Sequence, residues 1–351
     1  MNDFSDKIRN WYRQNQRDLP WRNTSNPFKI WLSEIILQQT RMSTGLIYYN
    51  KFKKKYPSVK KLSEANGEVL LKDWEGLGYY NRVKNLHFTA QFVQNELSGI
   101  FPNSQKELIK LKGIGRYSSS AIASICFNEK TPAIDGNVYR VLSRIFGIKL
   151  NISLNSTYSY FYKKSLPFIK EFKNAGDYNQ SLMDFGSIQC LPKKPLCSNC
   201  NQNKICYAFA HNKQDELPIK KRSVMIIKRY FNYYVFSYKD KFLVKKRDYN
   251  DVWGGLYEFY LEEKKKLIKS TYQINNNIKN FIKKNYSIKF SDTKTKLSHQ
   301  EIFVSFIEIK LFNSHDFKKI EKKLDLFDIN KKKLNMIAKP KVINEYLKKI
   351  S

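Results

Sequence analysis

The stretch from Leu111 to Gly147 constrains the fold more than any other part of this chain. Two glycines, Gly113 and Gly115, lie between apolar runs at its start, so backbone amides there can approach a ligand without a Cβ in the way. Amides exposed at the start of a helix bind anions. The stretch therefore predicts a turn that holds a phosphate, while the Gly-x-Gly pattern by itself fits an ordinary turn equally well.

A helix start that carries a carboxylate follows in the same stretch. Asp135-Gly136-Asn137 comes directly before apolar residues at the spacing i, i+3, i+4, i+7, which are Val138, Val141, Leu142 and Ile145. Asp135 therefore occupies the position of an N-cap. The spacing fits both a capping role and a chemical role for Asp135.

A second carboxylate, Glu34, stands on an apolar helix. Asn26-Pro27 is a helix-start signal, and the pattern predicts a helix that runs through Thr40. The neighbours of Glu34 one turn away on either side are largely apolar. Such surroundings desolvate a carboxyl group and raise its pKa, which suits a general acid. The alternative is an ordinary amphipathic helix with Glu34 in water.

Length and charge indicate a two-domain protein with a polyanionic partner. The chain has 351 residues, and its 64 Lys and Arg residues outnumber its 31 Asp and Glu residues for a net charge of +33. This excess does not suit a neutral metabolic enzyme and makes nucleic acid the first candidate partner, although AT-rich codon usage would also enrich lysine. No apolar run approaches the roughly 18 residues that span a bilayer. We expect a soluble cytoplasmic protein of bacterial, nucleoid-associated type, without a membrane partner.

Four of the five cysteines are clustered. They follow the pattern Cys190-x6-Cys197-x2-Cys200-x5-Cys206 and can fold around one metal centre. Zinc is one option, but its four-cysteine sites usually contain two CxxC pairs, and here only Cys197 and Cys200 form one. The fifth, Cys126, lies in an apolar run and is expected to be a small buried hydrophobe.

The glycine turn and the following Asp resemble the helix-hairpin-helix superfamily of DNA glycosylases, and residues 33–40 resemble the catalytic helix of MutY-type adenine DNA glycosylases. The resemblance implies that Glu34 protonates adenine and that Asp135 stabilises the sugar cation. It also implies that Asn137 and Tyr117 orient these groups and the attacking water. The cysteine spacing is similar to that of the iron-sulfur loop in endonuclease III and MutY relatives. This similarity implies a [4Fe-4S] cluster held by Cys190, Cys197, Cys200 and Cys206.

The same resemblance implies the DNA contacts. Gly113 and Gly115 would grip a backbone phosphate, and Tyr79, one of two adjacent tyrosines after a glycine-rich loop, would insert beside the damaged guanine. Of these two tyrosines we expect at least one to pack in the core. The end of the catalytic helix would wedge into the strands, through the residues Leu37, Gln38, Gln39 and Thr40.

The C-terminal part follows a different pattern. After a polar linker at 211–222, strands are predicted at 224–236, 241–244 and 301–312 and a helix at 275–285. This part resembles the Nudix-like domain of the MutY family, which reads 8-oxoguanine, but it lacks the carboxylate-rich Nudix box. The family's recognition hairpin typically carries Phe-Ser-His, and here Leu297-Ser298-His299 stands in its place. Ser298 and His299 can still offer hydrogen bonds to the modified base.

The predicted architecture is a mainly α helix-hairpin-helix glycosylase domain at 1–210, with its iron-sulfur loop at 190–206, followed by a C-terminal α+β Nudix-like domain at 223–351. The predicted activity is removal of adenine mispaired with 8-oxoguanine or guanine in double-stranded DNA, by a monomer that acts in base excision repair. Endonuclease III relatives carry a lysine where this chain has Tyr117, so we expect no strand cleavage. The alternatives are a bifunctional glycosylase/lyase for oxidised pyrimidines and a non-catalytic DNA-binding protein.

Overall fold

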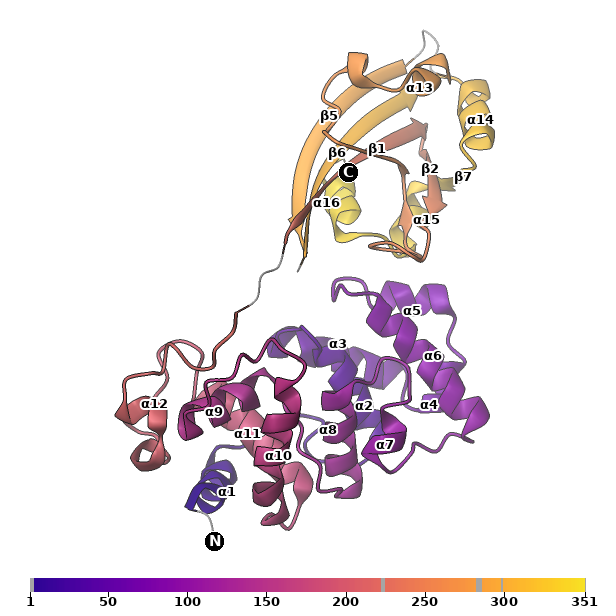
Figure 1. The fold of residues 1–351 in the computed structure, drawn as a ribbon. Helices are drawn as coiled ribbons and strands as arrows, with labels where there is room; N and C mark the ends of the chain where they lie inside the picture. The colour runs from indigo at the N-terminus through magenta and orange to yellow at the C-terminus, as the bar shows by residue number, and fades with distance from the viewer. Residues whose placement is uncertain (1–2, 222–224, 282–285, 298, 351) are drawn as a thin grey trace. The chain divides into compact units, whose positions relative to one another are not determined.

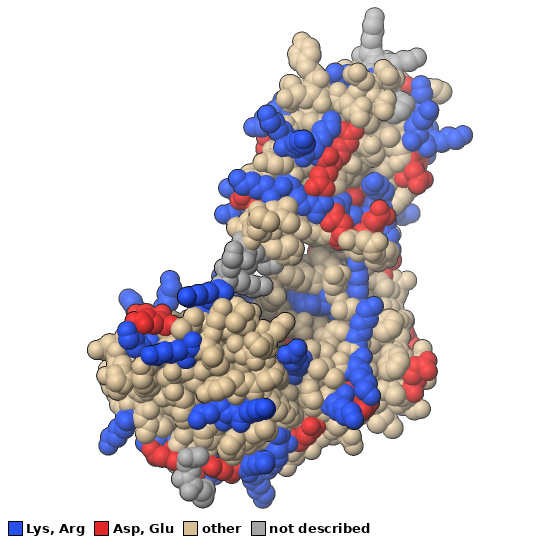
Figure 2. Space-filling view, viewed as in Figure 1, with Lys and Arg blue, Asp and Glu red and all other residues tan. Residues whose placement is uncertain are grey.

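The chain forms two compact units in the computed structural model, which describes residues 3–221, 225–281, 286–297 and 299–350 (Figure 1). The helical unit contains residues 1–65 and 81–222, and the sheet unit contains residues 66–80 and 223–351. The segment 66–80 thus belongs to the sheet unit although it stands in the first quarter of the chain. Lys and Arg side chains lie on the visible face of each unit (Figure 2).

Helices build the helical unit. They are α1 (Asp3–Asn15), α2 (Pro27–Leu37), α3 (Met42–Lys55), α4 (Val59–Ser63), α6 (Asn81–Glu96), α7 (Gln105–Leu108), α8 (Arg116–Phe127), α9 (Gly136–Phe146), α10 (Thr157–Lys170), α11 (Ala175–Ile188), η1 (Asn203–Ile205) and α12 (Tyr207–Ala210). A core of buried aromatic and aliphatic side chains joins α1, α9, α10 and α11, with Phe161, Tyr178 and Leu182 fully buried. This core stabilises the framework that presents α9, the helix that Asp135 caps.

Helix α2 begins where the sequence predicts and ends earlier. The Asn26 side chain caps it by accepting a hydrogen bond from the backbone N–H of Lys29 at 3.1 Å. The expectation that the helix runs to Thr40 is wrong, because it ends at Leu37. The Arg82 guanidinium donates to the carbonyl oxygens of Ile35, Ile36 and Gln38 at 3.1, 2.9 and 2.5 Å. Arg82 therefore satisfies carbonyl groups that another helical turn would have used.

The sheet unit is built on a mixed β-sheet. Its strands are β1 (Ile227–Tyr238), β2 (Lys241–Lys246), β3 (Tyr257–Glu258), β4 (Tyr260–Lys264), β5 (Tyr286–Lys296), β6 (Gln300–Leu311) and β7 (Phe327–Asn330). The order is β3-β2-β1-β6-β5, with β4 also paired to β1 and β7 to β2. Strands β1 and β6 are parallel, and the other described pairs are antiparallel. The strands predicted at 224–236 and 241–244 are confirmed as β1 and β2, which form an antiparallel hairpin in which Tyr238 faces Lys241.

Helices cover both faces of this sheet. They are η2 (Thr271–Gln273), α13 (Asn276–Phe281), α14 (Ser314–Lys323), α15 (Lys331–Met336) and α16 (Lys341–Lys349). The described part of the sheet unit also contains α5 (Gly67–Asp73), which contributes no residue to the two cores of the sheet. Phe231 and Tyr233 of β1 pack in the core that includes α16, whereas Tyr234 and Phe236 pack in the core that includes α14 (Figure 1). Alternate residues of β1 therefore serve opposite cores, which is why residues 233–236 of this strand are aromatic or aliphatic on both faces.

Parts of the sheet unit go beyond the sequence-based expectations. The strand expected at 301–312 is confirmed as β6, and the helix expected at 275–285 is described as α13 over Asn276–Phe281, with residues 282–285 outside the described part. Strands β5 and β7 and helices α14 to α16 were not predicted. No helix in the described part of the chain combines the length and the apolar character that a membrane span requires.

Candidate active site

The glycine turn joins two helices, as a helix-hairpin-helix motif requires. It lies between α7 and α8, and both of its glycines are exposed. Gly113 has φ +85°, and a Cβ built there would lie 2.8 Å from Cβ of Asn85. Gly115 is the N-cap of α8, and a Cβ there would point into open space. The turn therefore leaves its backbone uncovered next to a helix start.

Glu34 is half-buried on α2 between the buried residues Ser33 and Ile35. Burial raises the pKa of Glu34 to about 7 from its ordinary 4.5. A hydrogen bond from Tyr117 and the charge of Arg22 oppose this pKa shift, and the negative charge of Asp135 adds to it. The expected apolar environment of Glu34 is present. Near neutral pH the carboxyl group is therefore protonated in a large fraction of the molecules.

Asp135 caps α9, as its spacing predicts. Its Oδ1 accepts a hydrogen bond from the Val138 N–H at 2.8 Å, and its Oδ2 accepts one from Asn137 Nδ2, also at 2.8 Å. Burial raises the pKa of Asp135, while these donors and the Arg140 charge lower it. Burial therefore raises the pKa of both carboxyl groups, but Asp135 has two hydrogen-bond donors and a helix N-terminus that oppose this rise and favour its charged form.

Tyr117 lies beside both carboxyl groups. Burial and the charges of Glu34 and Asp135 raise the pKa of its phenol, so the hydroxyl group remains protonated. The hydroxyl lies 3.4 Å from Sδ of Met183 on α11 and hydrogen-bonds with Glu34. Helices α2, α8, α9 and α11 therefore contribute to one site, and the predicted catalytic residues Glu34, Tyr117, Asp135 and Asn137 come together in it.

An arginine pair bound to Asp184, of which Arg22 acts electrostatically on Glu34, was missed by the sequence reasoning. Arg17 donates to Oδ1 of Asp184 at 2.8 and 2.5 Å, and Arg22 donates to the same oxygen at 2.8 Å. The Asp184 side chain is fully buried. Arg22 also donates to the Tyr12 hydroxyl at 3.1 Å. Asp184 therefore fixes a guanidinium near Glu34. The only sequence signal was an Arg after Leu-Pro-Trp and an Asp in an apolar helix.

A polar chain links Asp135 to the cysteine loop. Arg140 is buried on α9 and donates to Oδ1 of Asn137 at 2.9 Å, to the Gly186 carbonyl at 2.6 Å and to the Cys190 carbonyl at 2.8 Å. Helix α11 passes close to Asn137, since a Cβ on Gly186 would lie 2.6 Å from Cβ of Asn137. The orientation of the Asn137 amide is thus fixed from two sides.

The four clustered cysteines line one small cavity beside Arg144. Arg144 donates to Sγ of Cys190 at 3.5 Å, and the Gln202 N–H donates to Sγ of Cys200 at 3.4 Å. No group of three or more metal-ligating side chains in the described residues is close enough to hold a single ion. Four cysteine thiols around one cavity, with N–H groups directed at two of the sulfurs, are a donor set that fits an all-cysteine metal centre such as an iron-sulfur cluster.

Comparison with known proteins shows the family. Residues 32–164 match the HhH-GPD superfamily of base excision DNA repair proteins. Over 308 residues the chain is 35% identical to an adenine DNA glycosylase of Buchnera aphidicola subsp. Baizongia pistaciae, with 87% of this chain and 86% of that protein covered. The chain belongs to the adenine DNA glycosylase family. It is therefore a DNA glycosylase, an enzyme that hydrolyses the N-glycosidic bond between a base and its sugar.

Two further comparisons support this glycosylase assignment. The adenine DNA glycosylase of Buchnera aphidicola subsp. Schizaphis graminum is 31% identical over 345 residues, which cover 98% of this chain and 97% of that protein. The solved structure of a thermostable thymine-DNA glycosylase matches with a TM-score of 0.55 and 30% identity, over 59% of this chain and 95% of that chain. The predicted fold, a helical glycosylase fold followed by a mixed-sheet domain, is confirmed.

The residues expected to wedge into the DNA lie at the C-terminal end of α2 and directly after it. Leu37 ends the helix, and Gln39 is exposed with a left-handed backbone, φ +53°. Arg82, a residue that the sequence reasoning missed, binds the carbonyl group of Gln38 and lies 3.1 Å from Oγ1 of Thr40. The segment therefore leaves the helix in one fixed conformation, with Gln39 at the surface.

The tyrosine pair divides as expected. Tyr80 is buried at 8% exposure, whereas Tyr79 is 46% exposed and has φ +47°. Gly76 and Gly78 before it also have positive φ, and the Gly78 carbonyl accepts a hydrogen bond from the Trp74 indole at 3.0 Å. The loop thus presents Tyr79 and holds Tyr80 inside.

The segment expected to read the lesion, residues 297–299, lies at the turn between the antiparallel strands β5 and β6. The Leu297 N–H donates to the Gln300 carbonyl at 2.8 Å, and the His299 side chain is exposed. Ser298 lies outside the described residues. Leu297 packs against a core of the sheet unit, so it occupies an inward position.

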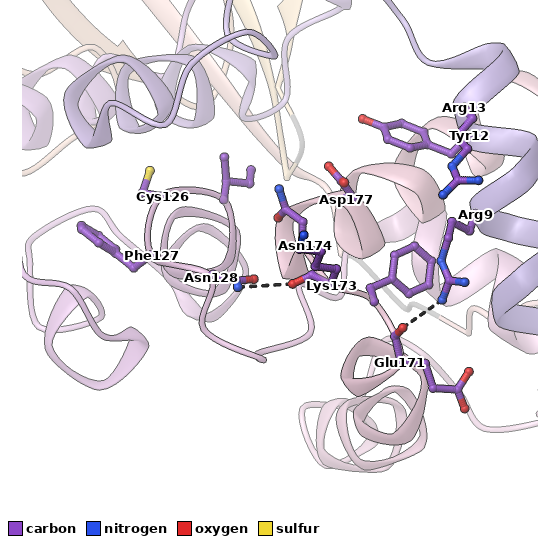
Figure 3. Close-up of a pocket in the computed structure, with 12 residues that line it drawn as sticks. Arg9, Tyr12, Arg13, Cys126, Phe127, Asn128, Glu171, Lys173, Asn174 and Asp177 are labelled. Atoms are coloured by element: carbon purple, nitrogen blue, oxygen red, sulfur yellow. Dashed lines mark hydrogen bonds between the residues drawn. The ribbon is translucent and has the colours of Figure 1, made fainter. Parts of the chain in front are cut away.

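A hollow of about 900 Å³ opens at the C-terminal end of α8. Figure 3 shows Cys126 projecting from α8 on one side and Tyr12 and Arg13 from α1 on the other, with Asp177 between them. Cys126 is only partly buried, which corrects the expectation that it is a small buried hydrophobe. Burial raises the pKa of its thiol to about 12, so the thiol stays protonated.

Proposed function

We propose that this glycosylase removes adenine mispaired with 8-oxoguanine or guanine in double-stranded DNA and leaves an abasic site. One observation carries the proposal. Glu34 and Asp135 share a site in which desolvation protects the proton of Glu34, while hydrogen bonds and a helix N-terminus favour a charged Asp135. Burial raises the pKa of both groups, and the donors around Asp135 oppose this rise, so Glu34 is the better proton donor and Asp135 the better anion of the pair. Such a division between two carboxyl groups is the usual basis of acid catalysis at a glycosidic carbon.

The reaction begins when the target base leaves the duplex. Flipping an adenine costs a few kcal/mol, and a mispair lowers this cost. Glu34 then gives its proton to adenine N7 as the bond between N9 and C1′ breaks, so the base departs neutral. The ionised Asp135 stabilises the oxocarbenium-like sugar. A water oriented by Asn137 and Tyr117 adds to C1′ and returns a proton to Glu34, which restores the acid.

Strand cleavage is not part of this proposal. A lyase needs an amine that forms a Schiff base with the sugar, and the position after the hairpin turn holds Tyr117. A phenol has no amine nitrogen and cannot form that intermediate in either protonation state. Borohydride treatment during turnover should therefore trap little enzyme on the DNA. Efficient trapping at the rate of base release would contradict a monofunctional enzyme and support the bifunctional alternative.

We propose DNA contacts at four places. The backbone of Gly113 and Gly115 binds a phosphate. The segment after α2 enters the strands near the mispair through Leu37, Gln38, Gln39 and Thr40. Tyr79 stacks beside the base opposite adenine, and Ser298 and His299 hydrogen-bond to 8-oxoguanine. The names of the related glycosylases specify adenine as the excised base, and we propose 8-oxoguanine or guanine as the base opposite it.

The cysteine loop is proposed to hold a [4Fe-4S] cluster through Cys190, Cys197, Cys200 and Cys206. We assign it a structural role, because Arg140 and Arg144 bind the backbone of this loop and Lys193 and Lys194 on the loop are exposed to bind phosphates. Iron and sulfide analysis with an absorption spectrum tests this assignment. About four irons per chain support it, whereas one zinc per chain contradicts it.

A substrate panel tests the activity. The purified chain is incubated with duplexes that carry A opposite 8-oxoguanine, A opposite G, T opposite G, or thymine glycol, with and without alkali. Cleavage of the A strand only after alkali supports the proposal. Release of thymine, the base in the name of the matched thymine-DNA glycosylase, from opposite guanine contradicts it. Cleavage at thymine glycol without alkali also contradicts it. Absence of any base release would support a binding protein. Light scattering of the same sample should give the mass of a monomer.

A further inference from the structure

The segment 66–80 connects two helices of the helical unit, α4 and α6, but packs with the sheet unit. It contains α5 and then the loop that ends at Tyr79 and Tyr80. Among the described residues, this segment is the part of the sheet unit that is inserted between two stretches of the helical unit in the sequence. The contacts that hold this segment in the sheet unit therefore affect the position of Tyr79.

Glu75 of this segment makes specific contacts with the C-terminal part of the sheet unit. Its Oε1 accepts a hydrogen bond from Asn344 Nδ2 at 2.6 Å and a longer one from the backbone N–H of Lys339 at 3.4 Å. Its Oε2 pairs with Lys72 on α5. The Glu75 side chain is 19% exposed, so these bonds lie largely out of water, where charge-assisted hydrogen bonds are strongest.

The partners of Glu75 are rigid. Asn344 stands on α16, whose Ile343, Tyr346 and Leu347 are buried in the core of the sheet. Lys339 is 1% exposed, and its ammonium group donates to the carbonyls of Leu334 and Ile337 at 2.6 and 3.1 Å. The lysine thereby braces the turn that points its own N–H at Glu75. A second ion pair, between Glu68 and Lys246, joins α5 to β2.

The loop after Glu75 needs such an anchor. Gly76 and Gly78 both have positive φ, and glycine loses more conformational entropy on ordering than any other residue. Tyr79 itself has φ +47°, a sparsely populated conformation for a residue with a side chain, which persists only where the surroundings enforce it. The buried Trp74 holds one carbonyl of the loop, that of Gly78. Glu75 ties the loop's first residues to the sheet.

We propose that Glu75 is a positioning residue that holds the Tyr79 loop on the sheet unit and thereby sets the preference for 8-oxoguanine over guanine opposite adenine. This inference rests on the proposed role of Tyr79. It places one determinant of base discrimination in a contact that touches no DNA. The lesion-reading unit would then deliver the stacking tyrosine and the hairpin as one assembly.

The test compares Glu75→Ala with Glu75→Gln in the full chain. Glutamine keeps an oxygen that can accept from Asn344 and Lys339 and gives up the negative charge that pairs with Lys72, so it should behave as wild type. Lys72→Ala is the matched control, because it removes that ion pair and leaves both hydrogen bonds. Asn344→Ala combined with Glu75→Ala completes a double-mutant cycle.

Two measurements are made on each variant. The first is kcat/KM for adenine release opposite 8-oxoguanine and opposite guanine. We expect Glu75→Ala to lower the ratio of the two values about tenfold, mainly through KM for the 8-oxoguanine duplex, while Glu75→Gln and Lys72→Ala keep the wild-type ratio. The second is hydrogen exchange of the DNA-free protein. Amides of 68–80 should exchange faster in Glu75→Ala, and the double variant should exchange no faster than the single ones.

An unchanged ratio in Glu75→Ala, or an equal loss on both duplexes, would overturn the proposal. So would unchanged exchange of residues 68–80. Should the wild type itself show no preference for 8-oxoguanine, the proposed function fails on that point. The exchange data would then still decide separately whether Glu75 anchors the loop.

Discussion

The Arg140 guanidinium donates a hydrogen bond of 2.9 Å to the side-chain oxygen of Asn137, and the Asn137 side-chain nitrogen donates one of 2.8 Å to Asp135. Arg140 also binds the carbonyl oxygen of Cys190. The residue proposed to stabilise the sugar cation is thus oriented through one arginine that also holds the start of the cysteine loop.

Replacing this arginine should impair the reaction more than DNA binding. Arg140→Gln leaves the Asn137 amide without its charged partner, so Asn137 can rotate away from Asp135. We expect the single-turnover rate of adenine release to fall at least tenfold, since a hydrogen bond to a charged group contributes about 1.5–3 kcal/mol. Arg9→Gln is the control, as the partners of Arg9 are Asp6, Glu171 and Phe172. Equal rates for Arg140→Gln and wild type would refute the orienting role.

The pKa of Glu34 makes stability depend on pH. The folded protein keeps the Glu34 proton up to about pH 7, whereas the unfolded chain loses it near 4.5. Folding therefore binds a proton between these values, and stability from this group falls as pH rises through that window. Glu34→Gln has no such proton. The free energy of unfolding of Glu34→Gln in urea, relative to that of the wild type, should therefore increase by about 2 kcal/mol from pH 5 to pH 8. Glu64→Gln, at an exposed residue, should show no such trend.

Asp184 should be essential for folding stability. Asp184→Asn would leave Arg17 and Arg22 without their buried counter-charge, and breaking a buried pair by removing one partner costs about 3–5 kcal/mol. Asp177→Asn, at an exposed neighbour on the same helix, is the control and should be nearly neutral. Denaturant unfolding at pH 7.5 measures both variants. A loss below about 1 kcal/mol for Asp184→Asn would show that the two arginines find other partners.

The two hairpin glycines should respond differently to alanine. Gly113→Ala forces a Cβ into a left-handed backbone and against Asn85, so the variant should lose stability by about 1–3 kcal/mol. Gly115→Ala has open space and should fold as wild type. Both methyl groups would hinder a phosphate at the turn, so both variants should bind duplex DNA less tightly. Normal DNA affinity for Gly115→Ala would argue against a phosphate there.

Much of the site follows from local sequence. The capping of α9 by Asp135, the glycine turn before α8 and the apolar face around Glu34 depend on residues within one or two helical turns, so spacing alone indicates them. Arg22, Arg82 and Arg140 were missed because their partners lie 162, 47 and 50 residues away in the sequence. An arginine that folds back onto backbone carbonyls has no periodic signature.

The end of α2 and the sheet unit show the same limit. The helical pattern continues past Leu37, and only the distant Arg82 explains why the helix stops. Strand β5 reads as a polar run, Tyr286–Lys296, because one of its faces is largely exposed, and its pairing with β6 supplies the order that its composition does not. The membership of 66–80 in the sheet unit depends on tertiary contacts such as that of Glu75 with Asn344.

The central claim is that Glu34 protonates the departing base. Free adenine is measured by chromatography under single-turnover conditions, from a duplex with A opposite 8-oxoguanine saturated with wild type or with Glu34→Gln. General acid catalysis contributes about 10²–10⁴-fold, so the variant should bind the duplex but release adenine at least about 100-fold more slowly. Adenine release by Glu34→Gln at a rate near that of the wild type would contradict the account.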